Sequence, residues 1–241
     1  MTILRPGRIR IASRPVLADV KPSTQFDLVS QWRVPAPLER WARVTVVPTT
    51  ATTDDARALL HEWVGSASLR RHCEAVAAAM SWQAELCGEQ PDRWAVCGLL
   101  HDADYERHPD MADEESGHPR TIIRHLRETG GDPEIIDAIA GHAPFLGVAR
   151  TTAMARTLFA VDELSGFVVA CCAVRPGGIV GLTPKSVKKK LKSPAFAAAV
   201  SRDDIAVGAQ ELGLDLDSHI ANVIAALTER AEALGLAADG E

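Results

Sequence analysis

Residues 91–102 read PDRWAVCGLLHD, and this stretch decides how the chain folds around it. Pro91 suits the first turn of a helix, and the apolar run after it predicts a buried helix. The run ends in the adjacent pair His101-Asp102. A carboxylate directly after a buried apolar segment costs free energy unless it has a partner, and the carbonyl end of a helix is negative. A metal ion would offset that cost; a surface aspartate at a fraying helix end is the alternative.

Four further side chains of the same chemical kind accompany the pair: His72 before it, and His118, His142 and Asp162 after it. Asp162 interrupts an apolar helix as Asp102 does. His118 and His142 each follow a glycine at a predicted helix end, where the backbone can approach closely. Imidazole and carboxylate are ligands for Fe, Mn and Zn, and Mg takes carboxylates. Six such side chains exceed the needs of one structural site and suit two neighbouring divalent metal ions.

Each of these residues also has a simpler interpretation when taken alone. His72 could be a hydrogen-bonded core histidine, and His118 and His142 could be solvent-facing residues at helix ends. The interpretation as a metal site therefore rests on all six residues in their order. Two carboxylates that each interrupt an apolar segment are stronger evidence for it than one.

The remaining pattern is helical, and no alternating strand pattern appears within residues 52–235. We expect an all-α fold in which residues 52–235 form a single-domain helical bundle, followed by a flexible tail at 236–241. The expected helices are 56–64, 68–87, 91–101, 118–129, 132–142, 151–174, one from 184 onward, 194–201 and 202–212, with 217–235 closing the fold and 103–117 forming a loop.

Residues 1–51 differ from the rest and predict an extended, irregular N-terminal arm. Residues 1–50 carry eight basic and three acidic side chains, a net charge of +5, and six prolines that disfavour helix. An organellar transit peptide is one alternative for this Arg-rich leader, and an over-long choice of start codon is another.

Composition excludes several classes of protein. The net charge of -6 argues against broad nucleic-acid binding, which needs a positive surface. No apolar run approaches the roughly twenty residues that cross a bilayer, and no secretory signal is apparent, so we expect no membrane partner and a cytoplasmic location. The five cysteines show no paired spacing and are expected to be small buried side chains. The sequence does not predict an oligomeric state.

The residues His72, His101-Asp102 and Asp162, in this order, resemble the HD-domain superfamily of metal-dependent phosphohydrolases over about residues 66–175. The added His118 and His142 resemble its six-ligand, two-metal branch. The resemblance implies that His72, His101 and Asp162 hold one metal, that the other two histidines hold a second, and that Asp102 joins both. The stretch 99–106 resembles bacterial members described only as predicted hydrolases, and the GYP signature of the cyclic-dinucleotide branch is missing.

These residues predict hydrolysis of a small phosphorylated metabolite or nucleotide, with Asp102 catalytic. Asp104 could act as a general base or orient a ligand histidine, with a solvated acidic loop as the alternative. Arg120 could grip a phosphate, and Lys188 in the lysine-rich run 185–192 could attract an anionic substrate; a surface ion pair and a solvated helix face are their alternatives. The other four histidines, which are His61, His108, His125 and His219, are expected to be surface or capping residues.

Two competing functions remain open from the sequence. A di-iron oxygenase could use the same scaffold and the same mixed ligand set to cleave a carbon–carbon or carbon–phosphorus bond. A non-catalytic binding module could use the metals only to hold its helices together, although a structural site has no need of open coordination positions.

Overall fold

The computed structural model describes residues 51–237. Within them every regular element is helical, so the all-α prediction is confirmed for this part of the chain. The predicted arm, apart from Ala51, and residues 238–241 of the predicted tail lie outside the described residues. In chain order the elements are α1 (Thr53–Trp63), α2 (Ala67–Cys87), α3 (Pro91–Leu100), α4 (Arg120–Glu128), α5 (Pro133–His142), the 3-10 turn η2 (Pro144–Leu146), α6 (Ala153–Ala173), α7 (Pro184–Leu191), α8 (Arg202–Glu211) and α9 (Leu216–Glu229).

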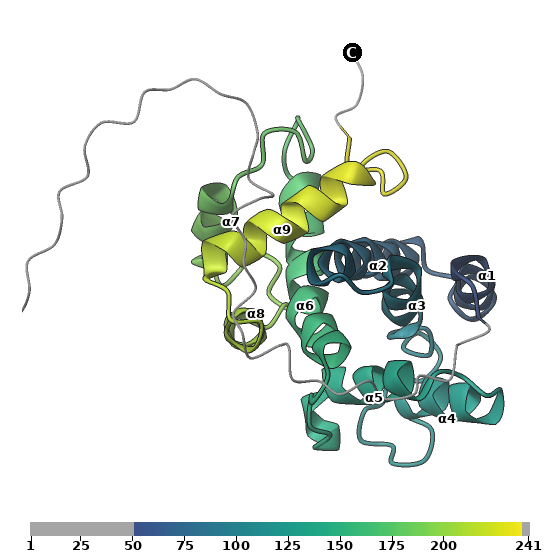
Figure 1. Ribbon diagram of the computed structural model, residues 1–241. Coiled ribbons are helices and arrows are strands. Elements are labelled where there is room, and N and C mark those ends of the chain that lie inside the picture. Colours follow the sequence, from purple (N-terminus) through teal and green to yellow (C-terminus); the bar gives the residue numbers. More distant parts are fainter. Residues whose placement is uncertain (1–50, 238–241) are drawn as a thin grey trace, which may run out of the picture. The chain divides into compact units, whose positions relative to one another are not determined.

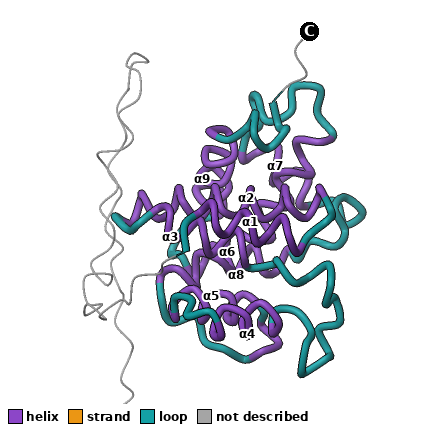
Figure 2. Tube along the Cα trace, turned by 90° about the vertical axis from the view of Figure 1, so that its right-hand side faces the viewer, coloured by secondary structure: helices purple, strands orange, loops and turns teal. Residues whose placement is uncertain are grey.

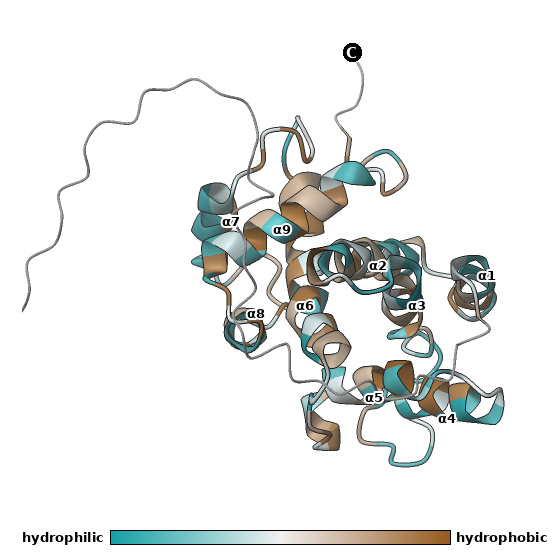
Figure 3. Cartoon of the chain, viewed as in Figure 1, coloured by the Kyte–Doolittle hydropathy of each residue, from teal (hydrophilic) through white to brown (hydrophobic). Residues whose placement is uncertain are grey.

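The long helix α6 organises the bundle. It packs against α2 and α5 and also against α8 and α9, so it lies between these two pairs of helices (Figure 1). The view turned by 90° shows α4 and α5 together at one end (Figure 2). Apolar side chains of α6 are buried along most of its length, from Met154 to Cys172. In Figure 3 the lysine-bearing helix α7 is largely hydrophilic, whereas α9 includes strongly hydrophobic positions.

The predicted helix at 194–201 is wrong. This segment forms turns, and Ala197 has φ 44°, in the left-handed region that non-glycine residues rarely adopt. The Arg202 guanidinium donates to the carbonyl oxygens of Ala197 at 2.6 Å and Val200 at 2.5 Å, and also to that of Phe196. A side chain therefore satisfies carbonyl groups that helical hydrogen bonds would otherwise use, and the local pattern gives no sign of it.

Two other boundaries differ from the expectation. The histidine at 118 precedes α4, which begins at Arg120, and the closing helix α9 ends at Glu229. After α9 the chain turns back, and the Ile179 N–H donates to the Leu236 carbonyl at 2.9 Å. This tertiary hydrogen bond accompanies a helix that is shorter than its apolar pattern suggests.

Helices α2 and α3 touch backbone to backbone at Gly98. A Cβ atom added at Gly98 would lie 2.6 Å from the Ala77 Cα, which real Cβ atoms do not tolerate. Trp94, Cys97 and Leu99 of α3 are all buried around this contact. Because α2 also carries His72 and α3 leads into His101, the close approach fixes how near these two side chains come.

Helices α3 and α5 run parallel, and both of their ends are joined. At the N-terminal ends, Arg93 donates to Asp132 at 2.6 Å and to Glu134 at 2.7 Å. At the C-terminal ends, the rings of His101 and His142 have centroids 5.3 Å apart. Both negative helix ends therefore point toward one place, which favours a cation there.

Two composition-based expectations can be checked over the described residues. No helix there is long and apolar enough to cross a membrane. All five cysteines are free, and four of them are buried, so the expectation of small buried side chains holds for every cysteine except Cys87, which is exposed.

We predict that Gly98→Ala destabilises the protein by about 1–3 kcal/mol, because the new methyl group forces α2 and α3 apart. The matched control is Gly166→Ala in α6, where the nearest atom to the added Cβ lies at an ordinary 3.5 Å. The control should be as stable as the wild type or more so, since alanine favours helix. Chemical denaturation measures both, and equal stability of the two variants would contradict the close approach.

Candidate metal centre

Four side chains from α2, the end of α3 and α6 converge on one point. The His72 Nε2 atom lies 3.0 Å from Asp162 Oδ1 and 3.3 Å from His101 Nε2. The His101 Nε2 atom lies 3.4 Å from Asp162 Oδ1 and 3.5 Å from Asp102 Oδ2. Atoms that each sit ~2.1 Å from one ion are about 3.0–3.4 Å apart, so these separations suit a metal. We refer to His72, His101, Asp102 and Asp162 as the first ligand group.

A second ligand group shares Asp102 with the first. The Nε2 atoms of His118 and His142 lie 3.3 Å and 3.6 Å from Asp102 Oδ1. The other oxygen of Asp102, Oδ2, faces His101 of the first group. One carboxylate thus offers one oxygen to each group, which is the arrangement needed to bridge two ions. The ligand atoms of His72, His101 and Asp102 lie close enough together to hold one metal ion, and so do those of Asp102, His118 and His142.

The imidazole rings are held with their Nε2 atoms toward the groups. The Nδ1–H of His101 donates to the Gly98 carbonyl at 2.7 Å, and that of His142 donates to the Ile139 carbonyl. The Nδ1–H of His118 donates to Asp104 Oδ1 at 2.7 Å. This pattern assigns the tautomer in each ring and leaves an Nε2 lone pair free for a cation.

Asp104 is fully buried, so the solvated acidic loop is wrong as its interpretation. Its second oxygen accepts the backbone N–H of Ile122 at 2.9 Å, which fixes the start of α4. Both oxygens are engaged inside the protein. The geometry therefore favours the orienting role over that of a general base, because the carboxylate does not face a substrate.

The glycine before one of the histidines allows a close backbone contact, as expected. A Cβ atom at Gly117 would lie 1.9 Å from the Asp110 carbonyl oxygen. At Gly141 the close neighbour is instead a side chain, since an added Cβ atom would lie 3.0 Å from Arg150 Cγ. The solvent-facing interpretation of His118 and His142 is wrong, because both side chains are buried.

A proton on His101 compensates part of the negative charge of the neighbouring carboxylates. Burial disfavours the charged form of His101, yet Asp102 and Asp162 outweigh burial and raise its pKa to about 9. Burial would raise the pKa of Asp102, but His101 and a hydrogen bond from His142 hold it well below the usual range. Burial, and then the neighbouring Asp162, raise the pKa of Glu163 to about 7. The carboxylates of Asp102 and Asp162, whose pKa values are both lowered, thus stay ionised and need positive charge from protons or from metal ions.

The site is partly open to solution. His101, His118 and His142 are buried, whereas the side chains of His72, Asp162 and Asp102 keep 23%, 19% and 16% of their surface exposed. These three side chains are therefore the part of the site that a solute from solution reaches first.

The two predicted substrate-binding residues lie in different surroundings. Arg120, two residues after His118, donates to the Met111 carbonyl at 3.2 Å, and its guanidinium lies 5.6 Å from the Phe145 ring. Arg120 thus belongs to the loop segments that carry the second ligand group. Lys188 forms an ion pair with Asp217 of α9 instead, and α7 packs on α9 and α6.

Other side chains near the site escaped the sequence pattern. The Tyr105 ring lies 5.1 Å from that of His118, edge to face. The signal for it was weak: a lone aromatic residue three positions after Asp102. His219 was expected at the surface, but it is buried and its Nε2 bonds to the Ala160 carbonyl at 2.9 Å. His61, His108 and His125 are not among the residues that form the two ligand groups.

Comparison with known proteins gives one match to a family model. Residues 69–166 match the family model described as the HD domain. The match includes all six residues of the two ligand groups. No curated protein and no solved structure matched the chain significantly.

We predict that the metal-free protein loses stability as pH rises from about 6.5 to 9. The folded-state pKa of His101 exceeds the ordinary histidine value of 6.5, so its stabilising charge is complete below that pH and lost as pH passes through about 9. Thermal unfolding in chelator across this range measures the effect. With a saturating divalent ion the added stability should instead grow with pH, because the ion displaces a proton. A flat metal-free profile would contradict the assignment.

Proposed function

We propose that this protein is a metal-dependent phosphohydrolase with two divalent ions. The observation that carries the proposal is the division of the Asp102 carboxylate between the two ligand groups, with Oδ2 toward one and Oδ1 toward the other. A structural site has no use for this sharing, because four ligands around one ion suffice. The HD-domain match over residues 69–166 supports the same conclusion.

The ligand chemistry fits the ions proposed. The first group would hold one ion through His72, His101, Asp102 and Asp162, and the second would hold another through Asp102, His118 and His142. Nitrogen and oxygen donors without thiolate suit Fe, Mn or Zn, and Mg more weakly because it prefers oxygen. Bound there, such ions polarise a phosphoryl oxygen and make water a better nucleophile near neutral pH.

Protein groups around the ligands would position the reactants. Asp104 holds the His118 ring and thereby the geometry of the second ligand group. Arg120 would pair with phosphate oxygens through its guanidinium, whose orientation is supported by the Met111 carbonyl and the Phe145 ring. A small anionic substrate, namely a phosphorylated metabolite or nucleotide, would meet the cations held by the partly exposed side chains of His72, Asp102 and Asp162.

We predict that two Asp→Asn variants, whose new side chains match the wild type in shape, lose different amounts of metal. Asp102→Asn removes the shared charge, so the purified protein should lose most of both ions and its phosphatase activity. Asp104→Asn should lower the affinity for one ion by about 10–100-fold while the first ligand group keeps its ion. Asp203→Asn, on the exposed first turn of α8, is the control. Metal analysis by mass spectrometry reads the result, and full metal content in Asp102→Asn would sink the proposal.

The role of Arg120 is tested by steady-state kinetics on a phosphate monoester. Arg120→Gln should raise KM at least about tenfold, because a guanidinium–phosphate contact is charge-assisted and bidentate. Arg124→Gln on the next turn of α4, where the guanidinium bonds to the Glu115 carbonyl, is the control for loss of one positive charge. Equal kinetics in both variants would remove Arg120 from the substrate site.

Lys188→Gln addresses the lysine-rich helix separately. Recruitment of an anionic substrate by α7 requires a higher KM and a flatter salt dependence in this variant. A KM unchanged at every salt concentration would leave the pairing with Asp217 as the role of Lys188. Oxygen uptake by the iron-loaded protein without phosphate release would replace hydrolysis with oxygenase chemistry, and stabilisation by metal without any turnover would indicate the binding module.

A further inference from the structure

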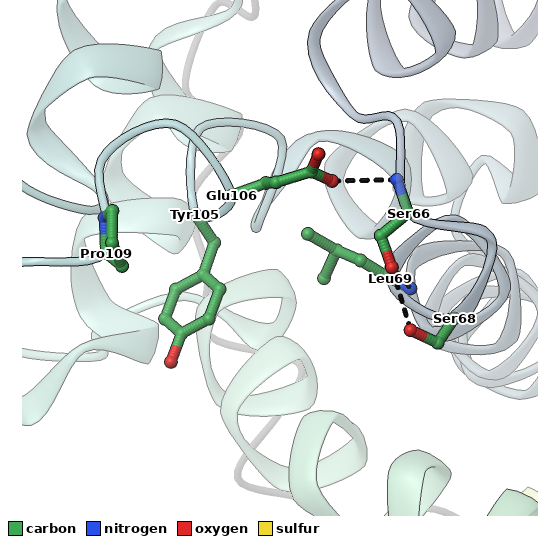
Figure 4. Close-up of a pocket in the computed structure, with 6 residues that line it drawn as sticks. All are labelled: Ser66, Ser68, Leu69, Tyr105, Glu106 and Pro109. Atoms are coloured by element: carbon green, nitrogen blue, oxygen red, sulfur yellow. Dashed lines mark hydrogen bonds between the residues drawn. The ribbon is translucent and has the colours of Figure 1, made fainter.

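A pocket of about 420 Å³ lies beside the two ligand groups. Its lining comes from the start of α2 and from the loop after α3, and consists of Ser66, Ser68, Leu69, Tyr105, Glu106 and Pro109 (Figure 4). Its size is near the lower end for small-molecule pockets. None of the metal ligands lines it.

Two of the lining residues connect the pocket to the ligands. Leu69 precedes His72 by three residues on α2, so the two side chains share one face of the helix. Tyr105 follows Asp102 by three residues, its N–H donates to the Asp102 carbonyl at 3.0 Å, and its ring contacts the His118 ring. The pocket is therefore about one turn away from ligands on both of its sides.

Glu106 makes the pocket unfavourable for an anion. Its Oε2 accepts the backbone N–H groups of Gly65 at 3.1 Å and Ser66 at 2.8 Å, at the start of α2. Figure 4 shows the Glu106 side chain reaching across to Ser66. The positive end of this helix is thus already matched by a carboxylate. A second negative group in the pocket would be repelled by that carboxylate.

The other walls are apolar or carry hydroxyl groups. Leu69 and Pro109 offer hydrocarbon surface, and the Tyr105 ring, 37% exposed, projects into the same space (Figure 4). The hydroxyl groups of Ser66 and Ser68 lie 2.8 Å apart and bond to each other. The pocket therefore suits an uncharged group with an apolar or aromatic face.

We propose that this pocket receives the uncharged leaving group of the phosphate ester, and that Tyr105 determines the preference for it. The inference rests on the proposed phosphohydrolase function. Hydrolysis breaks the phosphorus–oxygen bond, water supplies the new oxygen of phosphate, and its proton goes to the departing alcohol, whose carbon framework lies against Tyr105. Monoesters of aromatic or apolar alcohols are then better substrates than esters that carry a second negative group.

Two ligands that differ in one charge test the inference without requiring turnover. Calorimetry on the Mn²⁺-loaded full chain compares phenylphosphonate with 4-carboxyphenylphosphonate. We expect phenylphosphonate to bind at least about tenfold more tightly. Tyr105→Ala should weaken the binding of both ligands, because each places its ring against this side chain, whereas Tyr105→Phe should keep the affinity of both. Glu106→Gln, which retains an oxygen for the two N–H groups, should improve binding of the carboxylated ligand.

The same compounds as phosphate esters distinguish the two proposals. If phenylphosphonate binds with the expected preference but neither ester is hydrolysed, the hydrolase function fails and the pocket assignment stands. If the esters are hydrolysed but both ligands bind equally in wild type and Tyr105→Ala, the pocket assignment is overturned and the hydrolase stands. Absence of phenylphosphonate binding to the metal-loaded protein also overturns the pocket assignment. Circular dichroism of each variant confirms that it is folded.

Discussion

The carboxylate of Asp102 lies in a region of concentrated negative charge. The surrounding structure has to compensate that charge. Two parallel helices, α3 and α5, end beside it, so their negative carbonyl ends add to the charges of Asp102 and Asp162. Protons on the imidazoles balance this charge when no ion is present, as the pKa of about 9 for His101 indicates. The region is therefore built to hold cations, and each histidine ring is turned so that a nitrogen lone pair faces the place where a cation would bind.

The rest of the fold keeps these groups at ligand distance. The close contact at Gly98 sets the spacing of α2 and α3, and hence the 3.3 Å between the Nε2 atoms of His72 and His101. The ion pair of Arg93 with Asp132 fixes the far ends of α3 and α5. Asp104 ties the His118 ring to the start of α4. Distances within a metal site tolerate only a few tenths of an ångström, so such supports matter as much as the ligands.

In the proposed function, the pocket and the ligand groups would divide the recognition of a substrate between them. Cations and Arg120 would supply the attraction for a phosphoryl group. The neighbouring pocket, where Glu106 accepts the N–H groups of Gly65 and Ser66 just before α2, would reject further negative charge. A site organised in this way separates the charged from the uncharged part of one molecule. Such a separation orients the ester because each end has only one favourable place.

The sequence by itself determined the helical class of the described residues, most helix positions, and the six residues of the two ligand groups. Apolar periodicity, caps and the ordered His and Asp residues are local signals, and they do not depend on how distant segments meet. Local pattern failed at 194–201, where Arg202 binds the carbonyl groups, and at His219, which is buried against α6. Only the tertiary structure decided which oxygen of Asp102 serves each group, that Asp104 faces inward, and that Tyr105 lies beside His118. These depend on side-chain directions set by packing between helices far apart in the chain, and no spacing within a single helix encodes them.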